Sequence, residues 1–258
     1  MADIPDISET PDAPEVPSED QSSMMAAALK EYARLQELWI IVCMMILPYS
    51  IIWLGMNFFK SAVVSLALYH GFCLLPGIIW GKETFKNHLR APSFLQLLGL
   101  VVASILFSIT SVLAYLCFGD KVLSSPHVME LMRTVGYNQD IFWLISIYIV
   151  LINPILEELF WRGFVITKLD ELCPDFPHCG LIWSSFAYGA FHYPIMQLVM
   201  YPGWAEFGTI MLMLYGAMLG VLYKKTGKIL VPALAHASLT DLSAVILMLA
   251  LFHRLNAQ

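Results

Sequence analysis

Charged residues are scarce in this sequence. Asp, Glu, Lys and Arg together make up 13% of its 258 residues, whereas apolar residues make up 59%. A soluble globular domain has about 25% charged and about 45–50% apolar residues. The composition therefore excludes a soluble fold and predicts an all-α polytopic transmembrane helical bundle. The net charge of -6 arises mostly in the N-terminal tail, so it indicates no nucleic-acid partner.

Cysteine is also infrequent, with five residues. Three of them lie in apolar runs, where a small buried hydrophobic side chain is the expected role: Cys43, Cys73 and Cys117. Cys173 and Cys179 flank a short loop that contains His178, and this loop offers too few ligands for a zinc site. A disulfide between them requires that the loop face an oxidising compartment.

Large apolar residues are few at the N-terminus. Residues 1 to about 30 hold seven acidic residues, four prolines and one lysine, a composition that cannot bury a core. The stretch also lacks the basic region of a signal peptide. We predict that residues 1–36 form a disordered, acidic, Pro-rich tail with a juxtamembrane helix from Met24 to Glu37. Residues 37–258 are assigned to the transmembrane bundle.

Apolar segments of about 20 residues, the length that crosses a bilayer, recur along the rest of the chain. We count seven, at about 38–59, 61–80, 95–117, 141–168, 180–200, 206–223 and 229–252. An eighth element could lie in 82–94 or in 122–136, the latter as an interfacial helix.

Lys and Arg are distributed unequally between the two sides of such a bundle. Seven spans place nine of them on the N-terminal side and four on the other, with the intramembrane Arg162 left out. Cytoplasmic loops carry an excess of Lys and Arg. The N-terminus is therefore predicted to be cytoplasmic.

The fourth apolar segment contains three ionisable residues, Glu157, Glu158 and Arg162. Charges at membrane depth are costly and usually mark a functional site. On an α-helix Glu158 and Arg162 are four residues apart and can pair. Glu157 is about 140° round the helix from Arg162, so it is not the natural partner. The spacing predicts one carboxylate neutralised by arginine and one left free, as a general base requires.

Two histidines lie inside later apolar segments. A rise of about 1.5 Å per residue puts His192 about 18 Å in from Gly180, His236 about 12 Å in from Lys228 and Glu157 about 16 Å in from Lys168. Three helices could therefore bring these groups to one cavity. Thr240 shares the helical face of His236, whereas Asp241, five residues on, points off that face.

Each feature has a simpler explanation when taken alone. A single membrane histidine often serves as an interhelical hydrogen-bonding residue. Two glutamates and an arginine could form a structural ion-pair cluster or an ion pathway. Glu157, His192 and His236 are also competent zinc ligands. Their shared depth favours a reaction centre.

These residues resemble the motifs of the CPBP family, the intramembrane glutamic proteases that include the CAAX prenyl endopeptidases of the Rce1 type. Family members share Glu-Glu-x-x-x-Arg, then Phe-x-x-x-His, then His-x-x-x-Asn on successive membrane helices. The first motif is intact here, at Glu157, Glu158 and Arg162, with Gly163 after it. The second has Tyr188 before His192, and the third has Thr240 after His236. The resemblance covers about residues 141–245.

The resemblance implies an intramembrane endopeptidase without a cofactor. Glu157, helped by His192, would activate a water that attacks a peptide carbonyl. Glu158, held by Arg162, would orient the site. His236 and Thr240 would stabilise the oxyanion. Asp241 could take the place of Thr240 after a local bulge, although a carboxylate would repel an oxyanion.

The substrate implied is a membrane-associated protein or peptide, which could be lipidated as in CAAX-type processing. Other intramembrane protease designs fit less well, because the chain lacks a His-Glu-x-x-His zinc motif and has only one aspartate within a span. Two other functions stay open: a non-catalytic scaffold, binding or immunity protein, and a proton-coupled transporter. The lack of a clear internal repeat counts against the transporter.

Overall fold

A computed structural model describes residues 19–137 and 139–256. The chain divides into two units, Met1–Trp39 and Ile40–Gln258. Of the predicted tail, residues 1–18 lie outside the described residues. The predicted helix from Met24 to Glu37 lies within a helix that begins earlier, at Glu19. In this first unit the exposed side chains of Glu31 and Arg34 form an ion pair at 2.8 Å.

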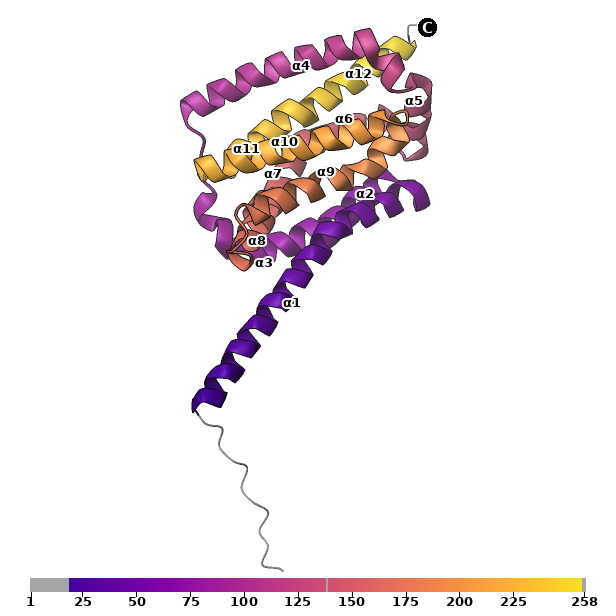
Figure 1. Ribbon diagram of the computed structural model, residues 1–258. Coiled ribbons are helices and arrows are strands. Elements are labelled where there is room, and N and C mark those ends of the chain that lie inside the picture. The colour runs from indigo at the N-terminus through magenta and orange to yellow at the C-terminus, as the bar shows by residue number, and fades with distance from the viewer. Residues whose placement is uncertain (1–18, 138, 257–258) are drawn as a thin grey trace, which may run out of the picture. The chain divides into compact units, whose positions relative to one another are not determined.

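The described residues are helical, apart from connecting turns and one isolated bridge between Leu123 and Met200. The α-helices, labelled in Figure 1, are α1 (Glu19–Trp53), α2 (Ala62–Tyr69), α3 (Leu75–Phe85), α4 (Phe94–Val122), α5 (Ser125–Thr134), α6 (Gln139–Leu151), α7 (Asn153–Glu158), α8 (Thr167–Leu172), α9 (Cys179–Val199), α10 (Trp204–Thr226), α11 (Leu230–Ala235) and α12 (Leu242–Asn256). The predicted all-α bundle is confirmed.

Six helical stretches of the described chain are long and apolar enough to cross a membrane. They are Glu19–Phe58, Ala62–Glu83, Phe94–Val122, Ile141–Leu172, Trp204–Thr226 and Leu230–Leu251. The remaining predicted segment, 180–200, is the 21-residue helix α9. Its serines, tyrosines, His192 and Gln197 make it less apolar than the other six. The protein is therefore an integral membrane protein that crosses the bilayer several times.

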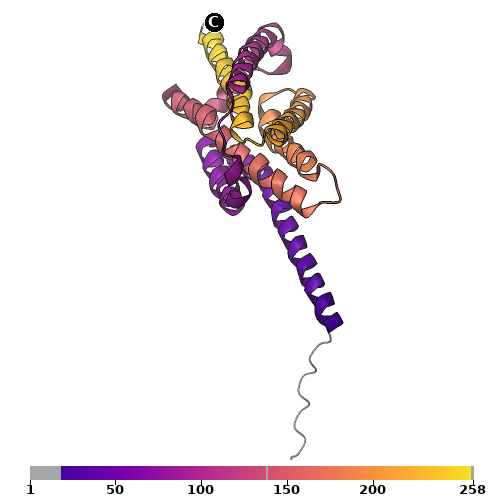
Figure 2. The same ribbon diagram turned by 90° about the vertical axis from the view of Figure 1, so that its left-hand side faces the viewer.

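Helix α9 still runs from one end of the bundle to the other (Figure 1). At its start the amide of Gly180 donates a hydrogen bond to Asp170 on α8, near the end of the fourth span. Just after its end the amide of Tyr201 donates to the carbonyl of Val122, where α4 ends. Figure 2 looks along the bundle and shows α12 beside α4.

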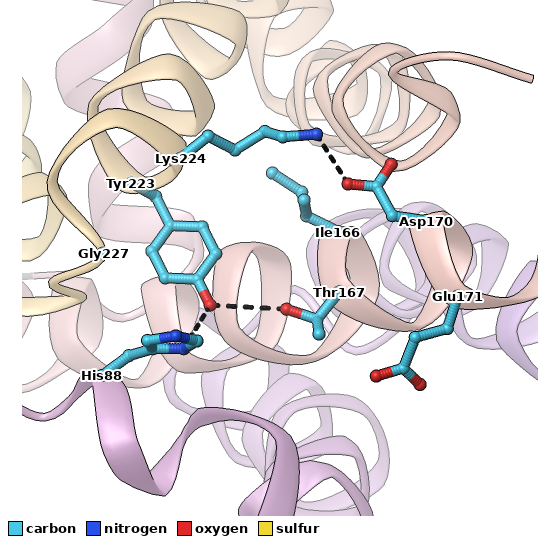
Figure 3. Close-up of a pocket in the computed structure, with 8 residues that line it drawn as sticks. All are labelled: His88, Ile166, Thr167, Asp170, Glu171, Tyr223, Lys224 and Gly227. Atoms are coloured by element: carbon cyan, nitrogen blue, oxygen red, sulfur yellow. Dashed lines mark hydrogen bonds and ion pairs between the residues drawn. The ribbon is translucent and has the colours of Figure 1, made fainter. Parts of the chain in front are cut away.

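The end of the bundle that carries most of the loop lysines is held together by polar contacts (Figure 3). The hydroxyl of Tyr223 lies 2.8 Å from Nδ1 of His88 and 3.4 Å from the hydroxyl of Thr167. Lys224 pairs with Asp170 at 2.6 Å. These groups line an open pocket of about 400 Å³. These polar groups come from three separate parts of the chain and satisfy one another's hydrogen bonds. We therefore interpret the cluster, which we call the clasp, as a contact that stabilises this end of the bundle.

At the opposite end, the additional element considered in 122–136 is present as the helix α5. Its buried residues Val128 and Met132 pack against Leu251 near the C-terminus of α12. The other proposed eighth element, in 82–94, contains only the end of α3 and a 3₁₀ turn at Lys86–His88. Cys173 and Cys179 are free thiols, so the structure has no disulfide across their loop.

Helices α9 and α10 form the most extensive helix pair in the bundle. Gly189 allows their close approach, because a Cβ atom at this position would lie 2.7 Å from the backbone nitrogen of Met213 and 2.9 Å from the carbonyl oxygen of Thr209. Backbone atoms cannot move aside as a flexible side chain can. The α9–α10 crossing therefore depends on a residue without a side chain.

We expect Gly189→Ala to destabilise the protein by about 1–3 kcal/mol, because the added methyl group forces the two helices apart. The measurement is the thermal unfolding midpoint in one detergent. The matched control is Gly99→Ala, since a Cβ at Gly99 on α4 meets nothing within 4 Å. Equal midpoints for the two variants would contradict the role given to Gly189.

Several membrane helices contain π-helical turns, in which a backbone amide donates to the carbonyl oxygen five residues earlier. They are η1 (Leu54–Phe58), η2 (His70–Leu74), η4 (Leu159–Ile166) and η5 (His236–Asp241). Such turns are rare and often occur at functional sites. The fourth span also breaks at Ile152, where α7 restarts with Pro154 in its first turn, a position that needs no amide hydrogen. Helix α7 after this break carries Glu157 and Glu158, η4 carries Arg162, and η5 carries His236 and Asp241.

Candidate active site

An ion pair lies at the centre of the bundle, between Glu158 at the end of α7 and Arg162 in η4. Arg162 Nη1 donates to Glu158 Oε1 at 2.7 Å, and the two side chains are 1% and 0% exposed. Arg162 Nη2 also donates to the carbonyl oxygen of Gly216 on α10, at 3.0 Å. The pair expected from the spacing is therefore present, and it joins the fourth span to α10.

His236, the first residue of η5, brings a third helix to this pair. Its Nδ1 lies 2.9 Å from Glu158 Oε1. A carboxylate oxygen only accepts hydrogen bonds, so Nδ1 carries a proton and donates it. Its Nε2 faces the Tyr188 hydroxyl at 3.2 Å and Glu157 Oε2 at 3.8 Å. Glu158 thereby orients the imidazole, with Nε2 turned toward Glu157.

Glu157 is buried, at 4% exposed, and it is not paired with Arg162. Its Oε1 accepts a hydrogen bond from the Asn153 side-chain amide at 3.1 Å. Its Oε2 has no hydrogen-bond partner among the described residues. The Tyr69 hydroxyl lies beside the same carboxyl and accepts a hydrogen bond from Trp161 Nε1 at 3.3 Å. One oxygen of Glu157 is thus held in place, and the other has no hydrogen-bond partner among the described residues.

His192 lies next to this group but does not join it directly. Its Nδ1 is 2.7 Å from the carbonyl oxygen of Tyr188, so Nδ1 must donate. In the neutral imidazole this leaves Nε2 as an acceptor. The ring packs on Phe191 with centroids 3.9 Å apart. Within the described residues no ion pair connects His192 to Glu157, so any cooperation between them needs a molecule in between.

The position of Asp241 differs from the prediction. On an α-helix it points away from the face of His236, but the π turn η5 has more residues per turn and returns Asp241 to that face. Asp241 Oδ1 lies 3.5 Å from His236 Nε2. The Thr240 hydroxyl instead donates to the carbonyl oxygen of His236 at 2.8 Å. The local bulge considered from the sequence is therefore present.

Three residues at the site were missed by the sequence analysis as contributors: Asn153, Tyr69 and the hydroxyl of Tyr188. Asn153 is four residues before Glu157, so helical spacing could have indicated it. Tyr69 comes from the second span, and nothing in its local sequence points to Glu157. Tyr188 was considered only as a replacement for the phenylalanine of the family motif, so its hydroxyl was given no role.

The described residues contain no group of three or more His, Cys, Asp and Glu side chains arranged to hold a metal ion. The three zinc ligands considered above, Glu157, His192 and His236, do not form such a group. Tyr188, Glu157 and Asp241 all approach the same nitrogen of His236. The arrangement is suited to proton transfer and to hydrogen bonding.

Comparison with known proteins gives one family. Residues 139–240 match the model for "Type II CAAX prenyl endopeptidase Rce1-like". No curated protein and no solved structure matches the chain significantly. The matched range contains all three motifs, and the family implies a peptide-bond hydrolase that acts on a membrane-associated protein in a lipid bilayer. The match over residues 139–240 thus supports the resemblance of this part of the chain to the CAAX-type proteases of the Rce1-like family.

Proposed function

We propose that the protein hydrolyses a peptide bond of a membrane-associated substrate with a water molecule activated by Glu157. The observation that carries this proposal is the open oxygen of Glu157. Oε2 is buried and has no hydrogen-bond partner among the described residues, whereas Oε1 accepts a hydrogen bond from Asn153. A held carboxylate with one free oxygen inside a water-poor site can take a proton from a bound water.

In the first step, Glu157 Oε2 accepts one proton of the water as its oxygen attacks the carbonyl carbon. A bond forms between water oxygen and carbon, and the carbonyl π electrons move to the carbonyl oxygen, which becomes an oxyanion. Nε2 of His192 accepts a hydrogen bond from the same water and aligns it. His236 Nε2 faces Glu157 at 3.8 Å, so we expect a hydrogen-bond donor for the oxyanion beside this nitrogen.

In the second step, the proton held by Glu157 passes to the leaving nitrogen and the carbon–nitrogen bond breaks. The products are a new carboxyl end and a new amine, and Glu157 is again a carboxylate. Glu158 and Arg162 take no part in proton transfer. They fix the imidazole of His236, while Thr240 supports the turn that carries it. No step requires a cofactor.

The topology of this proposal places the N-terminus in the cytoplasm. Lysines and arginines gather in the loops at the end of the bundle described as the clasp: Lys82, Lys86, Arg90, Lys168, Lys224, Lys225 and Lys228. The opposite end of the second unit has few, among them Lys60, Lys121 and Arg133. This asymmetry supports a cytoplasmic clasp end.

The proposal is tested with purified protein in detergent and a set of peptides made in pairs, each with and without a C-terminal prenyl group. We expect cleavage at one bond, incorporation of one ¹⁸O from labelled water into the new carboxyl end, and the same rate with and without a chelator. Loss of cleavage in chelator would contradict a glutamate-activated water and favour a metal. Preference for the prenylated member of a pair would support CAAX-type processing.

A further inference from the structure

The side chain of Tyr188 is enclosed on several sides. It is 1% exposed. The Arg162 guanidinium carbon lies 4.5 Å from the centre of one face of its ring, and Trp161 meets it edge-on. A Cβ atom on Gly216 would come within 3.0 Å of ring atom Cδ1, so α10 closes another side. With the ring fixed, the hydroxyl has one position, beside Nε2 of His236 at 3.2 Å.

The other groups at this nitrogen are acidic. Glu157 Oε2 is 3.8 Å away and Asp241 Oδ1 is 3.5 Å away. A carboxylate repels an oxyanion, and the hydroxyl of Thr240 is already bonded to the carbonyl oxygen of His236. Among the described side chains that contact Nε2 of His236, the phenol of Tyr188 is therefore the neutral group that can donate a hydrogen bond to a developing negative charge.

The charges around His236 indicate which way the phenol proton points. Glu157, Glu158 and Asp241 all lie within 3.8 Å of the imidazole, and the other cation in contact with these groups is Arg162. A doubly protonated His236 best balances such a surplus of carboxylates. Nε2 then donates a hydrogen bond to the hydroxyl oxygen of Tyr188, so the proton of that hydroxyl is free to point to another acceptor. The hydrogen bond that the hydroxyl accepts makes the hydroxyl a stronger donor.

We propose that the hydroxyl of Tyr188 donates a hydrogen bond to the carbonyl oxygen of the scissile peptide bond as that oxygen becomes an oxyanion. This inference rests on the proposed function. It explains two departures from the family motifs together. A hydroxyl is gained at Tyr188, where the motif has phenylalanine, and an amide is lost at Thr240, where the motif has asparagine. Both positions lie beside His236.

The test is Tyr188→Phe, which removes one oxygen and restores the residue of the family motif. We expect kcat to fall about 100- to 1000-fold, the typical loss for one oxyanion donor, with KM unchanged. A peptide phosphinate, whose tetrahedral anionic group resembles the intermediate, should bind the variant more weakly by a similar factor. The matched control is Tyr223→Phe, which loses a hydroxyl of the clasp (Figure 3) and should keep the wild-type kcat.

A kcat within threefold of wild type, or a loss confined to KM, would overturn the inference, as would unchanged phosphinate binding. If the hydroxyl only positioned His236, substrate and phosphinate would lose affinity equally, which also overturns it. Glu157→Gln in the same assay separates the two proposals. If Glu157→Gln keeps the wild-type cleavage rate and Tyr188→Phe loses it, only the proposal that Glu157 activates the water is contradicted. A wild-type protein that cleaves none of the peptides counts against both.

Discussion

Replacing Glu157 by glutamine should lower kcat about 10⁴-fold, the upper range for loss of a general base. The amide of glutamine has the same shape as the carboxylate, so its oxygen can still accept the hydrogen bond that Asn153 donates at 3.1 Å to Glu157 Oε1. It cannot take a proton from water. The fold and the substrate contacts should therefore survive, and the loss should appear in kcat. The measurement is steady-state cleavage of the best peptide of the set.

Glu157→Asp should give an intermediate loss. Aspartate keeps the carboxylate but is shorter by one methylene group. A misplacement of about 1 Å can lower the reaction rate about 100-fold. The matched control is Glu171→Gln, the same chemical change at a carboxylate that is half exposed and paired with Lys168 at 3.1 Å. It should leave kcat unchanged. Retention of more than a tenth of the wild-type kcat in Glu157→Gln would show that another group activates the water.

The prediction of this site from sequence depended on the α-helical period. That period is enough for Glu158 and Arg162, because four residues make about one turn, and the pair is present at 2.7 Å. It is also enough to separate Glu157 from the arginine. The apolar lengths predicted the bundle, because a bilayer accepts few other structures. These inferences need only the geometry of the α-helix and the apolar nature of the bilayer.

The same period failed where the helix is not an α-helix. Asp241 approaches His236 because of the π turn η5, in which the amide of Leu242 donates to the carbonyl of Ala237. The hydroxyl of Ser104 on α4 donates to the carbonyl oxygen of Ser238 within that turn, at 2.8 Å. A partner 134 positions away in sequence supports the irregular hydrogen bonding. Local periodicity cannot reveal such a contact.

Tyr69 shows a second reason for incomplete prediction. It lies in the second span, outside the range that resembles the family, and it reaches Trp161 and Glu157 only through the packing of helices. Neighbouring membrane helices are selected by close packing and interhelical hydrogen bonds. A single sequence does not show which helices are neighbours, so the site was predicted from the segments that carry its charges.

Replacing Arg162 by methionine should destabilise the protein by about 3–5 kcal/mol, the cost of removing one partner from a buried ion pair. Glu158 is 0% exposed and would keep His236 as its partner, while the carbonyl oxygen of Gly216 would lose the bond that Arg162 donates. Methionine fills much of the same volume, so lost packing contributes little. The measurement is the free energy of unfolding in mixed micelles with increasing denaturing detergent.

The control is Arg133→Met, in which the arginine side chain is 71% exposed and its oxygen partner on Glu130 is 3.9 Å away. Exposed ion pairs of this kind contribute little to stability, so no shift is expected. The double variant Arg162→Met with Glu158→Met should be more stable than Arg162→Met alone, because the cost comes from a carboxylate left in an apolar interior. Additive losses in the double variant would show that the two residues act through separate contacts. Recovery would show that the bundle tolerates the loss of the pair as a structural element, so that the pair's main contribution is to hold His236 beside Glu157 for catalysis.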